Sequence, residues 1–396
     1  MTDEEPVPFA HVAGPHDART VVIGEAWGEA EERYRVPFAG ASGREFARML
    51  CDAGYDAAGT LRAASEEESD TAFLAQREEW LHSQSIMLTN VFALRPINNN
   101  LGYLCGKKEE CGTAYTLPKI RNENPTFLLP RYMPHLRRLA SELCYCPRNL
   151  ILALGGTALW SLSGSSAIGR VRGAVGQVAR CAPIAEGEMQ WLPQWKMLPT
   201  YHPAAIFRAW QWRPIVLADL IKALRERETP LITRPARTII INPTIEEVEI
   251  WTRETLSDDA RYAALAPDIE TMNGQIRCIG FARSASEAIV IPFIADKSGT
   301  SYWSDARDEY HAWACVRDLL ASPLPKIFQN GMFDMQYLIR MGMHVVNARH
   351  DTMLLHHVMY PEMQKSLGFL GSIYTNETAW KLMRLHKGEE ELKRDE

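Results

Sequence analysis

Two carboxylates on one apolar strand, with a third after a second strand, are the feature that most constrains this chain. Residues 266–271 read Ala-Pro-Asp-Ile-Glu-Thr, so Asp268 and Glu270 are two positions apart. Residues two apart on an extended strand lie on the same face, so this strand presents both carboxylates together. A second apolar strand, 325–329, leads into Asp334 at the start of a helical pattern. Three oxygen ligands of this kind suit a pair of Mg²⁺ or Mn²⁺ ions acting on a phosphodiester.

The segments between these carboxylates predict a mixed sheet. Residues 276–283 and 288–293 are short apolar runs separated by Ser-Ala-Ser-Glu, which predicts a hairpin. A helical pattern over 310–320 precedes the second carboxylate strand. Because a bare Asp-x-Glu more often marks only a solvated strand end, the order of the elements carries the argument.

This order resembles the ribonuclease H-like 3′–5′ exonuclease domain of family A DNA polymerases, over roughly residues 238–396. The resemblance implies that Asp268, Glu270 and Asp334 are catalytic ligands of Mg²⁺ or Mn²⁺. It also makes Asn330, in the second motif Gln-Asn-Gly-Met-Phe-Asp, a candidate DNA contact. We interpret Asp351, at the start of the next predicted helix, as an N-cap.

The third motif of that family, Tyr-x-x-x-Asp, has no counterpart after Asp351, because Tyr360 and Tyr374 are followed four residues later by Gln364 and Thr378. The resemblance therefore implies an incomplete exonuclease domain. We interpret the chain as the N-terminal part of a phage-type replication DNA polymerase, or as one product of a split gene. A C-terminal polymerase portion or a partner chain would then supply the missing carboxylate.

The N-terminal half predicts a parallel sheet sandwiched by helices, so the chain as a whole is of the α/β class. Apolar strands at 21–24, 86–91, 150–154 and 197–200 each end in polar residues or glycine, and helical stretches separate them. Ligands of such sheets bind outside the carboxyl ends of the strands.

Five ordered motifs at these strand ends resemble the uracil-DNA glycosylase superfamily, most closely its family 4, over roughly residues 15–227. The motifs are Gly-Glu-Ala-x-Gly, Pro-Phe-x-Gly-x-x-Gly, Thr-Asn-Val, Leu-Gly-Gly-Thr-Ala and Thr-Tyr-His-Pro-Ala-Ala. The resemblance implies a pocket for a base flipped out of DNA. Five motifs in the right order are far more specific than any one of them.

The resemblance also implies a role for each pocket residue. Phe38 would stack on the base, Asn90 would read its polar edge, and His202 would face the carbonyl oxygen that gains charge. Glu25, with Glu31 as a second candidate, would hold the attacking water or stabilise the sugar cation. Each also has a plain structural interpretation, such as a core aromatic, a turn residue or a buried histidine with satisfied nitrogens. Trp27 replaces the proline usual in the first motif, and we expect it at the pocket rim, where it would narrow the pocket or stack on the base.

Contact with DNA must come from local patches, because the net charge of −6 gives no overall attraction to nucleic acid. Ile206 and Phe207 are candidates to wedge into the base stack, and Arg208 and Arg213 are candidates to bind phosphates. A solvated face with tryptophan packed inward is the alternative for this segment.

The eight cysteines argue against two cofactors. Family 4 enzymes hold an iron–sulfur cluster on four cysteines, but the first cysteine here is Cys51, inside a predicted helix, and the strand after Asn90 ends in Ala-Leu-Arg. Cys105, Cys111, Cys144 and Cys146 miss the usual spacing of a zinc site. We therefore expect neither an iron–sulfur cluster nor zinc.

The domain boundaries predicted from the sequence are 1–227 for the glycosylase-like domain, 228–237 for a linker and 238–396 for the exonuclease-like domain. The acidic start and the absence of a long apolar run predict a cytoplasmic protein, in the host if phage-encoded, with DNA as partner and no membrane contact. Two alternatives stay open: a non-catalytic DNA-binding or docking module, and a stand-alone uracil-excision repair protein.

Overall fold

The computed structural model describes residues 5–111, 120, 127–179, 181–185, 188–257 and 261–377. The chain forms two compact units. The first unit comprises the residues up to Thr233 together with the segment from Gly368 onward, and the second unit comprises Arg234–Leu367. The segment Gly368–Glu377, which the sequence groups with the exonuclease-like domain, thus lies with the first unit. No helix of the described residues is long and apolar enough to span a bilayer.

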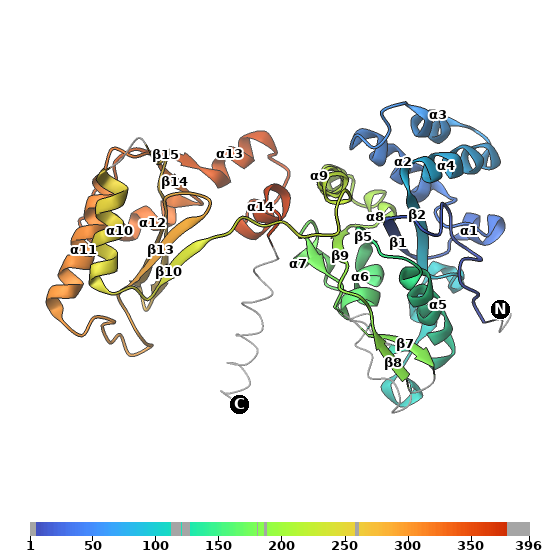
Figure 1. Ribbon diagram of the computed structural model, residues 1–396, viewed down its shortest axis with the longest axis horizontal. Helices are drawn as coiled ribbons and strands as arrows, with labels where there is room; N and C mark the ends of the chain where they lie inside the picture. The colour runs from blue at the N-terminus through green and yellow to red at the C-terminus, as the bar shows by residue number, and fades with distance from the viewer. Residues whose placement is uncertain are drawn as a thin grey trace. The chain divides into compact units, whose positions relative to one another are not determined.

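The first unit is built on a sheet with the strand order β2-β1-β5-β9-β6 (Figure 1). Its four long strands are parallel, and β6 is antiparallel to β9. They are β1 (Thr20–Ala26), β2 (Ile86–Phe92), β5 (Leu150–Leu154) and β9 (Lys196–Thr200), with β6 at Gly176–Gln177. The four strands predicted from apolar runs are confirmed.

Both faces of this sheet are buried, because alternate residues of each strand enter two separate apolar cores. Leu150, Leu152 and Leu154 of β5 point into one core, and Ile151 and Ala153 into the other. The first core is completed by α2 (Ala41–Asp52), α3 (Thr60–Glu66), α4 (Asp70–Gln84), α8 (Pro203–Ile206) and α9 (Arg213–Glu226). The second is completed by α5 (Met133–Cys144) and α6 (Gly155–Ser163). Polar side chains of these strands are therefore left for the sheet's edges and ends.

Shorter elements connect these layers. They include α1 (Glu29–Tyr34), α7 (Ile168–Val171), α14 (Leu367–Tyr374) and the hairpins β3–β4 (Cys105–Gly106, Phe127–Leu128) and β7–β8 (Cys181–Ala185, Glu188–Trp191). Short 3₁₀ turns cover Ile97–Asn99, Leu101–Leu104, Lys108–Cys111, Pro130–Tyr132 and Trp210–Trp212.

The second unit contains a mixed sheet with the strand order β10-β13-β12-β11. Strands β11 (Ala266–Met272), β12 (Gln275–Ala282) and β13 (Glu287–Pro292) are antiparallel neighbours, whereas β10 (Thr238–Ile241) is parallel to β13. The predicted hairpin and mixed sheet are confirmed. A further parallel pair joins β14 (Lys326–Phe328) to β15 (Ala348–Asp351). The helices are α10 (Ile245–Ser257), α11 (Ala306–Ala321), α12 (Gly331–Arg340) and α13 (Thr352–Met359).

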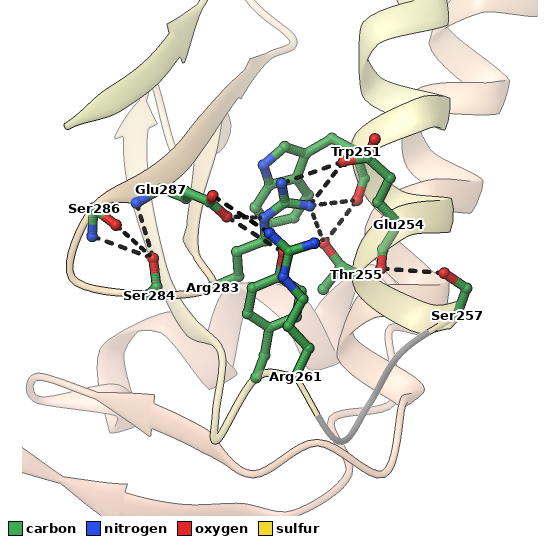
Figure 2. Close-up of polar contacts among 10 residues, drawn as sticks. Trp251, Glu254, Thr255, Ser257, Arg261, Arg283, Ser284, Ser286 and Glu287 are labelled. Atoms are coloured by element: carbon green, nitrogen blue, oxygen red, sulfur yellow. Dashed lines mark hydrogen bonds and ion pairs between the residues drawn. The ribbon is translucent and has the colours of Figure 1, made fainter.

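Arg283, at the end of β12, ties the sheet of the second unit to helix α10 (Figure 2). Its Nε donates to Glu287 Oε2 at 2.7 Å, and its terminal nitrogens donate to Glu254 Oε2 at 3.3 Å and Thr255 Oγ1 at 3.2 Å. Its guanidinium also lies 4.9 Å from the ring centre of Trp251. Because the side chain is only 9 % exposed, these groups satisfy a charge that has lost most of its water.

We expect Arg283→Met to lower the free energy of unfolding by about 2 kcal/mol, because it removes the donor to Thr255 Oγ1 and leaves Glu287 Oε2 with the longer bond from the Tyr262 hydroxyl. Glu254 is half exposed and can recover water, which keeps the loss below that of a fully buried pair. Urea titration measures the change. Arg261→Met is the matched control, since Arg261 is 58 % exposed and 3.9 Å from Glu287. Equal effects of the two substitutions would contradict the role given to Arg283.

Candidate functional site

The carboxyl ends of the parallel strands in the first unit gather the residues singled out from the sequence. Glu25 lies near the end of β1, Asn90 near the end of β2, and Thr157 in the first turn of α6 after β5. His202 follows β9 as the N-cap of α8. Because these strands are parallel neighbours, all four positions lie along one edge of the sheet.

Asn90 and Phe38 lie against each other across Gly24. A Cβ built on Gly24 would lie 2.5 Å from Asn90 Oδ1 and 2.8 Å from Phe38 Cζ, so this position admits no side chain. Asn90 is 4 % exposed, and its Oδ1 is buried with no hydrogen-bond donor among the described residues. The site therefore contains a buried acceptor, close to an aromatic ring, for which the described part of the chain supplies no donor.

Phe38 adopts a left-handed backbone conformation, with φ of 55°. Gly43 allows it, because a Cβ on Gly43 would lie 1.9 Å from the Phe38 carbonyl oxygen. Arg77, which is 3 % exposed, donates from a terminal nitrogen to that same oxygen at 2.5 Å, and its burial lowers its pKa to about 10. The sequence reasoning missed Arg77, since a lone arginine inside a helical pattern carries no distinctive signal.

His202 is neutral and has one defined tautomer. Its Nδ1 accepts from the Ala204 backbone N–H at 3.1 Å, which leaves Nε2 as the protonated nitrogen. Burial, and secondarily the charge of Arg208, lowers its pKa to about 4. The His202 and Phe38 rings are nearly parallel, with centres 6.0 Å apart. At neutral pH the site thus offers an uncharged N–H donor next to Phe38.

Glu25 is held by Thr157. The Thr157 hydroxyl donates to Glu25 Oε2 at 2.6 Å, and Thr157 is 4 % exposed. Burial raises the pKa of Glu25, while the Thr157 bond and the charge of Arg208 oppose that rise. The sequence reasoning did not single out Thr157, although it is the threonine of the Leu-Gly-Gly-Thr-Ala motif.

Glu31 serves as a brace between two loops. Its two oxygens accept from the backbone N–H groups of Gly28 at 2.9 Å and Gly40 at 3.1 Å, and the side chain is 7 % exposed. Both oxygens are therefore committed to protein donors. Glu31 joins the first motif to the loop that presents Phe38.

Trp27, which the sequence places at the pocket rim, is buried. It is 3 % exposed, and its ring packs edge-on against His11 at 4.8 Å. Its backbone N–H donates to the carbonyl oxygen of Leu94, which itself packs against the second core. Leu94 belongs to the stretch Ala93-Leu94-Arg95 just after β2, which carries no cysteine. An apolar side chain at this position does not fit an iron–sulfur cluster.

The expected DNA contacts differ in exposure. Phe207 is 56 % exposed, and Arg208 is also exposed, whereas Ile206 has no exposed surface and packs in the first core. We therefore withdraw Ile206 as a wedge. Arg213 pairs with Glu45 at 2.8 Å and Asp52 at 2.6 Å, so its charge is already neutralised within the protein.

Of the three predicted metal carboxylates of the second unit, Asp334 is bonded to the strand that carries the other two. Asp268 and Glu270 are exposed on one face of β11, while Ile269 between them is buried on the other. Asp334, in the first turn of α12, accepts from the Ile269 N–H at 3.0 Å. Burial, and the nearby charges of Asp268 and Asp351, raise the pKa of Asp334 to about 6.

Asn330 and Asp351 shape the start of α12. Asn330 is the N-cap of that helix with φ of 62°, and its backbone N–H donates to Asp351 Oδ1 at 3.1 Å. Asp351 also caps α13 by accepting from Met353 and Leu354, which confirms its predicted N-cap role. Although burial alone would raise the pKa of Asp351, these backbone donors hold it below its ordinary value.

The donor chemistry of Asp268, Glu270 and Asp334 fits a divalent cation, because carboxylate oxygens are the ligands that Mg²⁺ and Mn²⁺ prefer. A bound cation would also offset the crowding of negative charge that raises the pKa of Asp334. Within the part of the chain that the structure describes, no group of three or more His, Cys, Asp or Glu side chains is gathered closely enough to hold a metal ion.

The model of the uracil DNA glycosylase superfamily matches residues 11–225, more than half of the chain. The chain belongs to this superfamily. A 3′–5′ exonuclease model matches residues 243–395, so a 3′–5′ exonuclease domain follows the glycosylase-like domain. Both domain resemblances are thereby confirmed, whereas the link to a family A polymerase stays a prediction.

Individual relatives cover one domain each. The type-4 uracil-DNA glycosylase of Thermotoga maritima is 26 % identical over 214 residues, which are 53 % of this chain and 78 % of that protein. Two solved nucleases each cover 34 % of this chain. One is described as the apo form of the nuclease (18 % identity, TM-score 0.22, 58 % of its chain). The other is the EXD2 exonuclease domain soaked in Mn and GMP (15 % identity, TM-score 0.23, 68 % of its chain). This chain thus spans a little over half of the first nuclease.

We expect Asp334→Asn to stabilise the protein at pH 8. The folded protein binds the proton of Asp334 more tightly than the unfolded chain does, because the carboxyl pKa is raised from 3.8 to about 6. The stability that this proton contributes is complete below pH 3.8 and is lost as the pH rises through about 6. Asparagine keeps the acceptor for Ile269 but carries no charge, so the free energy of unfolding should rise by about 1–2 kcal/mol at pH 8 and by almost nothing at pH 4. Urea titrations without divalent metal at the two pH values measure this.

The control for this prediction is Asp318→Asn, because Asp318 lies on α11 and is half exposed beside Arg317. Its effect should stay within about 0.5 kcal/mol at both pH values. A gain for Asp334→Asn that is equal at pH 4 and pH 8 would rule out the electrostatic explanation.

Proposed function

We propose that the first unit binds a uracil base flipped out of DNA and hydrolyses its N-glycosidic bond. The observation that carries the proposal is the buried Asn90 Oδ1, which faces Phe38 without a donor among the described residues. Leaving a buried acceptor unpaired costs about 1–3 kcal/mol, so a ligand that supplies the donor gains that energy. Uracil offers an N–H beside a carbonyl oxygen, the complement of an asparagine amide.

His202 would stabilise the leaving base. When the bond between uracil and C1′ of the sugar breaks, its electron pair leaves with the base, and negative charge collects on a ring carbonyl oxygen. A neutral Nε2–H donor held in a partly dry site stabilises that charge more than it stabilises the uncharged base. The pKa of about 4 supports this role, because the imidazole stays neutral in the pH range where the reaction would run.

Glu25 would act on the sugar side of the same bond. Its carboxylate would stabilise positive charge at C1′ and orient the water whose oxygen bonds to C1′ while its proton neutralises the departing base. Thr157 would keep one carboxylate oxygen in place. Flipping the base costs a few kcal/mol, which stacking on Phe38 and the contacts to Asn90 must offset.

DNA is the partner that both domains imply. We infer that the exposed Phe207 and Arg208, together with Trp210 at 62 % exposure, contact an unpaired strand beside the pocket. Aromatic rings stack on bases without sequence preference, and arginine neutralises phosphates. Weakened binding of single-stranded DNA in Arg208→Ala, with a smaller dependence on salt, is the expected sign of such contact.

A second candidate function is metal-dependent 3′–5′ exonuclease activity in the second unit. The bond from Ile269 N–H to Asp334 favours it, because it ties the third carboxylate to the strand that carries the other two. Asp268, Glu270 and Asp334 would hold Mg²⁺ or Mn²⁺, which when bound would polarise the phosphate and activate water. Mg²⁺-dependent shortening of a 5′-labelled strand that is lost in Asp268→Asn would support this function.

The test of the proposed excision is release of free uracil from a single-stranded, uracil-containing oligonucleotide in EDTA, which silences any metal nuclease. We expect wild-type protein to release uracil, and Glu25→Gln and His202→Ala each to lower the rate by about 10²–10³-fold. Glu32→Gln is the control, since Glu32 is a neighbouring carboxylate that is 54 % exposed.

The alternatives give different results in that experiment. Binding of the oligonucleotide without release would overturn excision and favour a DNA-recognition module. Excision by this chain alone supports a stand-alone repair protein. Nuclease activity restored only by an added polymerase chain supports the replication-polymerase assignment.

The pH dependence of uracil release should respond to Thr157. Glu25 acts as a carboxylate, and the Thr157 hydroxyl opposes the rise that burial causes in its pKa. Thr157→Val removes that donor, so we expect the acidic limb of the rate profile to move up by about 0.5–1 pH unit while the alkaline plateau persists. Thr157→Ser keeps the donor and should follow wild type. A uniform loss at all pH values would indicate misplacement of Glu25 instead.

A further inference from the structure

Helix α14 from Gly368 onward and residues 375–377 belong to the first unit although they follow the second unit in sequence. The residues of the first unit that contact this segment are Arg172, Gly173, Lys222 and Glu226, and we call them its seat. Lys222 lies on α9 and is 1 % exposed. Its Nζ donates to Gly173 O at 2.8 Å, to Thr375 O at 2.7 Å and to Ser372 O. An ammonium group has three protons to donate, and here three carbonyl oxygens accept them.

Two of those carbonyl oxygens come from the C-terminal end of α14. The last carbonyl groups of a helix lack partners within the helix and carry partial negative charge. Lys222 satisfies them with a positive charge that has almost no water of its own. Removing the segment would leave the buried ammonium group of Lys222 without two of its acceptors. Removing the Lys222 charge would leave the last carbonyl groups of α14 without their donor.

Three further contacts shape the seat. Gly173 has φ of 71°, and a Cβ built there would lie 2.9 Å from Ser372 O, so the backbone of α14 approaches it directly. The Arg172 guanidinium lies 5.0 Å from the ring centre of Phe369. Asn376 Nδ2 donates to Glu226 Oε1 at 2.6 Å.

The same seat is bonded to the strand that delivers His202. Asp219 accepts from Arg172 Nε at 3.0 Å and from the Thr200 hydroxyl at 2.6 Å, and Asp219 has no exposed surface. Gly173 N–H donates to the carbonyl oxygen of Pro199 at 2.7 Å. Thr200 is the last residue of β9, two residues before His202. A continuous set of buried polar contacts thus runs from α14 to the end of β9.

We propose that the segment Leu367–Glu377 is a positioning element of the base site, and that Lys222 fixes it so that Arg172 and Asp219 hold the end of β9. This proposal rests on the proposed function, because it assigns the segment an effect on excision. Lys222 and Phe369 are then positioning residues, because neither contacts His202. Their effect on His202 passes through Arg172, Asp219 and Thr200.

The experiment uses the full chain and compares Lys222→Met with Phe369→Ala, which weaken the seat from opposite sides. Hydrogen exchange of the backbone amides in 198–202 and 369–376 is measured together with kcat and KM for uracil release. We expect exchange to speed up at least about tenfold in both segments. We expect kcat to fall by roughly 10–100-fold with little change in KM, because the base contacts of Phe38 and Asn90 persist while His202 is displaced.

Lys326→Met is the matched control, because Lys326 is a fully buried lysine of the second unit whose Nζ bonds only within that unit, to Ser322. It should leave exchange in 198–202 and uracil release unchanged.

Faster exchange in 369–376 with no change in 198–202 would overturn the proposal, because the segment would then be attached without positioning β9. If Lys222→Met fails to fold, Phe369→Ala still decides between these outcomes. If wild-type protein releases no uracil, the proposed function fails, and the exchange data alone decide whether the segment holds β9.

Discussion

The chemistry of the first unit depends on the burial of both faces of a parallel sheet. Every side chain of β5 enters one of two apolar cores, and the polar side chains of the candidate site lie toward the carboxyl ends of the strands. Glu25, Asn90 and His202 come from strands far apart in the sequence and meet there because the strands are parallel neighbours. The site is thus a consequence of the sheet's topology.

Desolvation shifts the pKa of titratable side chains in both units. In the first unit it lowers the pKa of His202 to about 4 and raises the pKa of Glu25, which the Thr157 hydroxyl opposes. In the second unit burial raises the pKa of Asp334, and the charges of Asp268 and Asp351 add to that rise. Burial thus disfavours the charged form of a side chain in both units.

The sequence was sufficient for features that depend on local pattern. The parallel strands of the first unit, the hairpin β12–β13 and the cap at Asp351 follow from apolar runs, turn residues and a capping side chain, and all are present. It failed where a role depends on distant partners. Trp27 and Ile206 are apolar residues next to motifs, and only the packing of the fold decides that both are buried. The role of Glu31 stays a prediction, but the sequence could not show that its two oxygens accept from backbone N–H groups, one of them nine residues away.

After the second unit the chain returns to the first unit, so the second unit is inserted into the first and is not simply joined to its end. The second unit ends at Leu367, and the residues that follow it contact Lys222. A protease cut near residue 234 would divide the chain into two fragments, and the fragment that carries the second unit would be held to the first unit by the contacts of α14 and not by a covalent bond. Expression of residues 1–233 alone would leave the buried Lys222 without the carbonyl oxygens of Ser372 and Thr375.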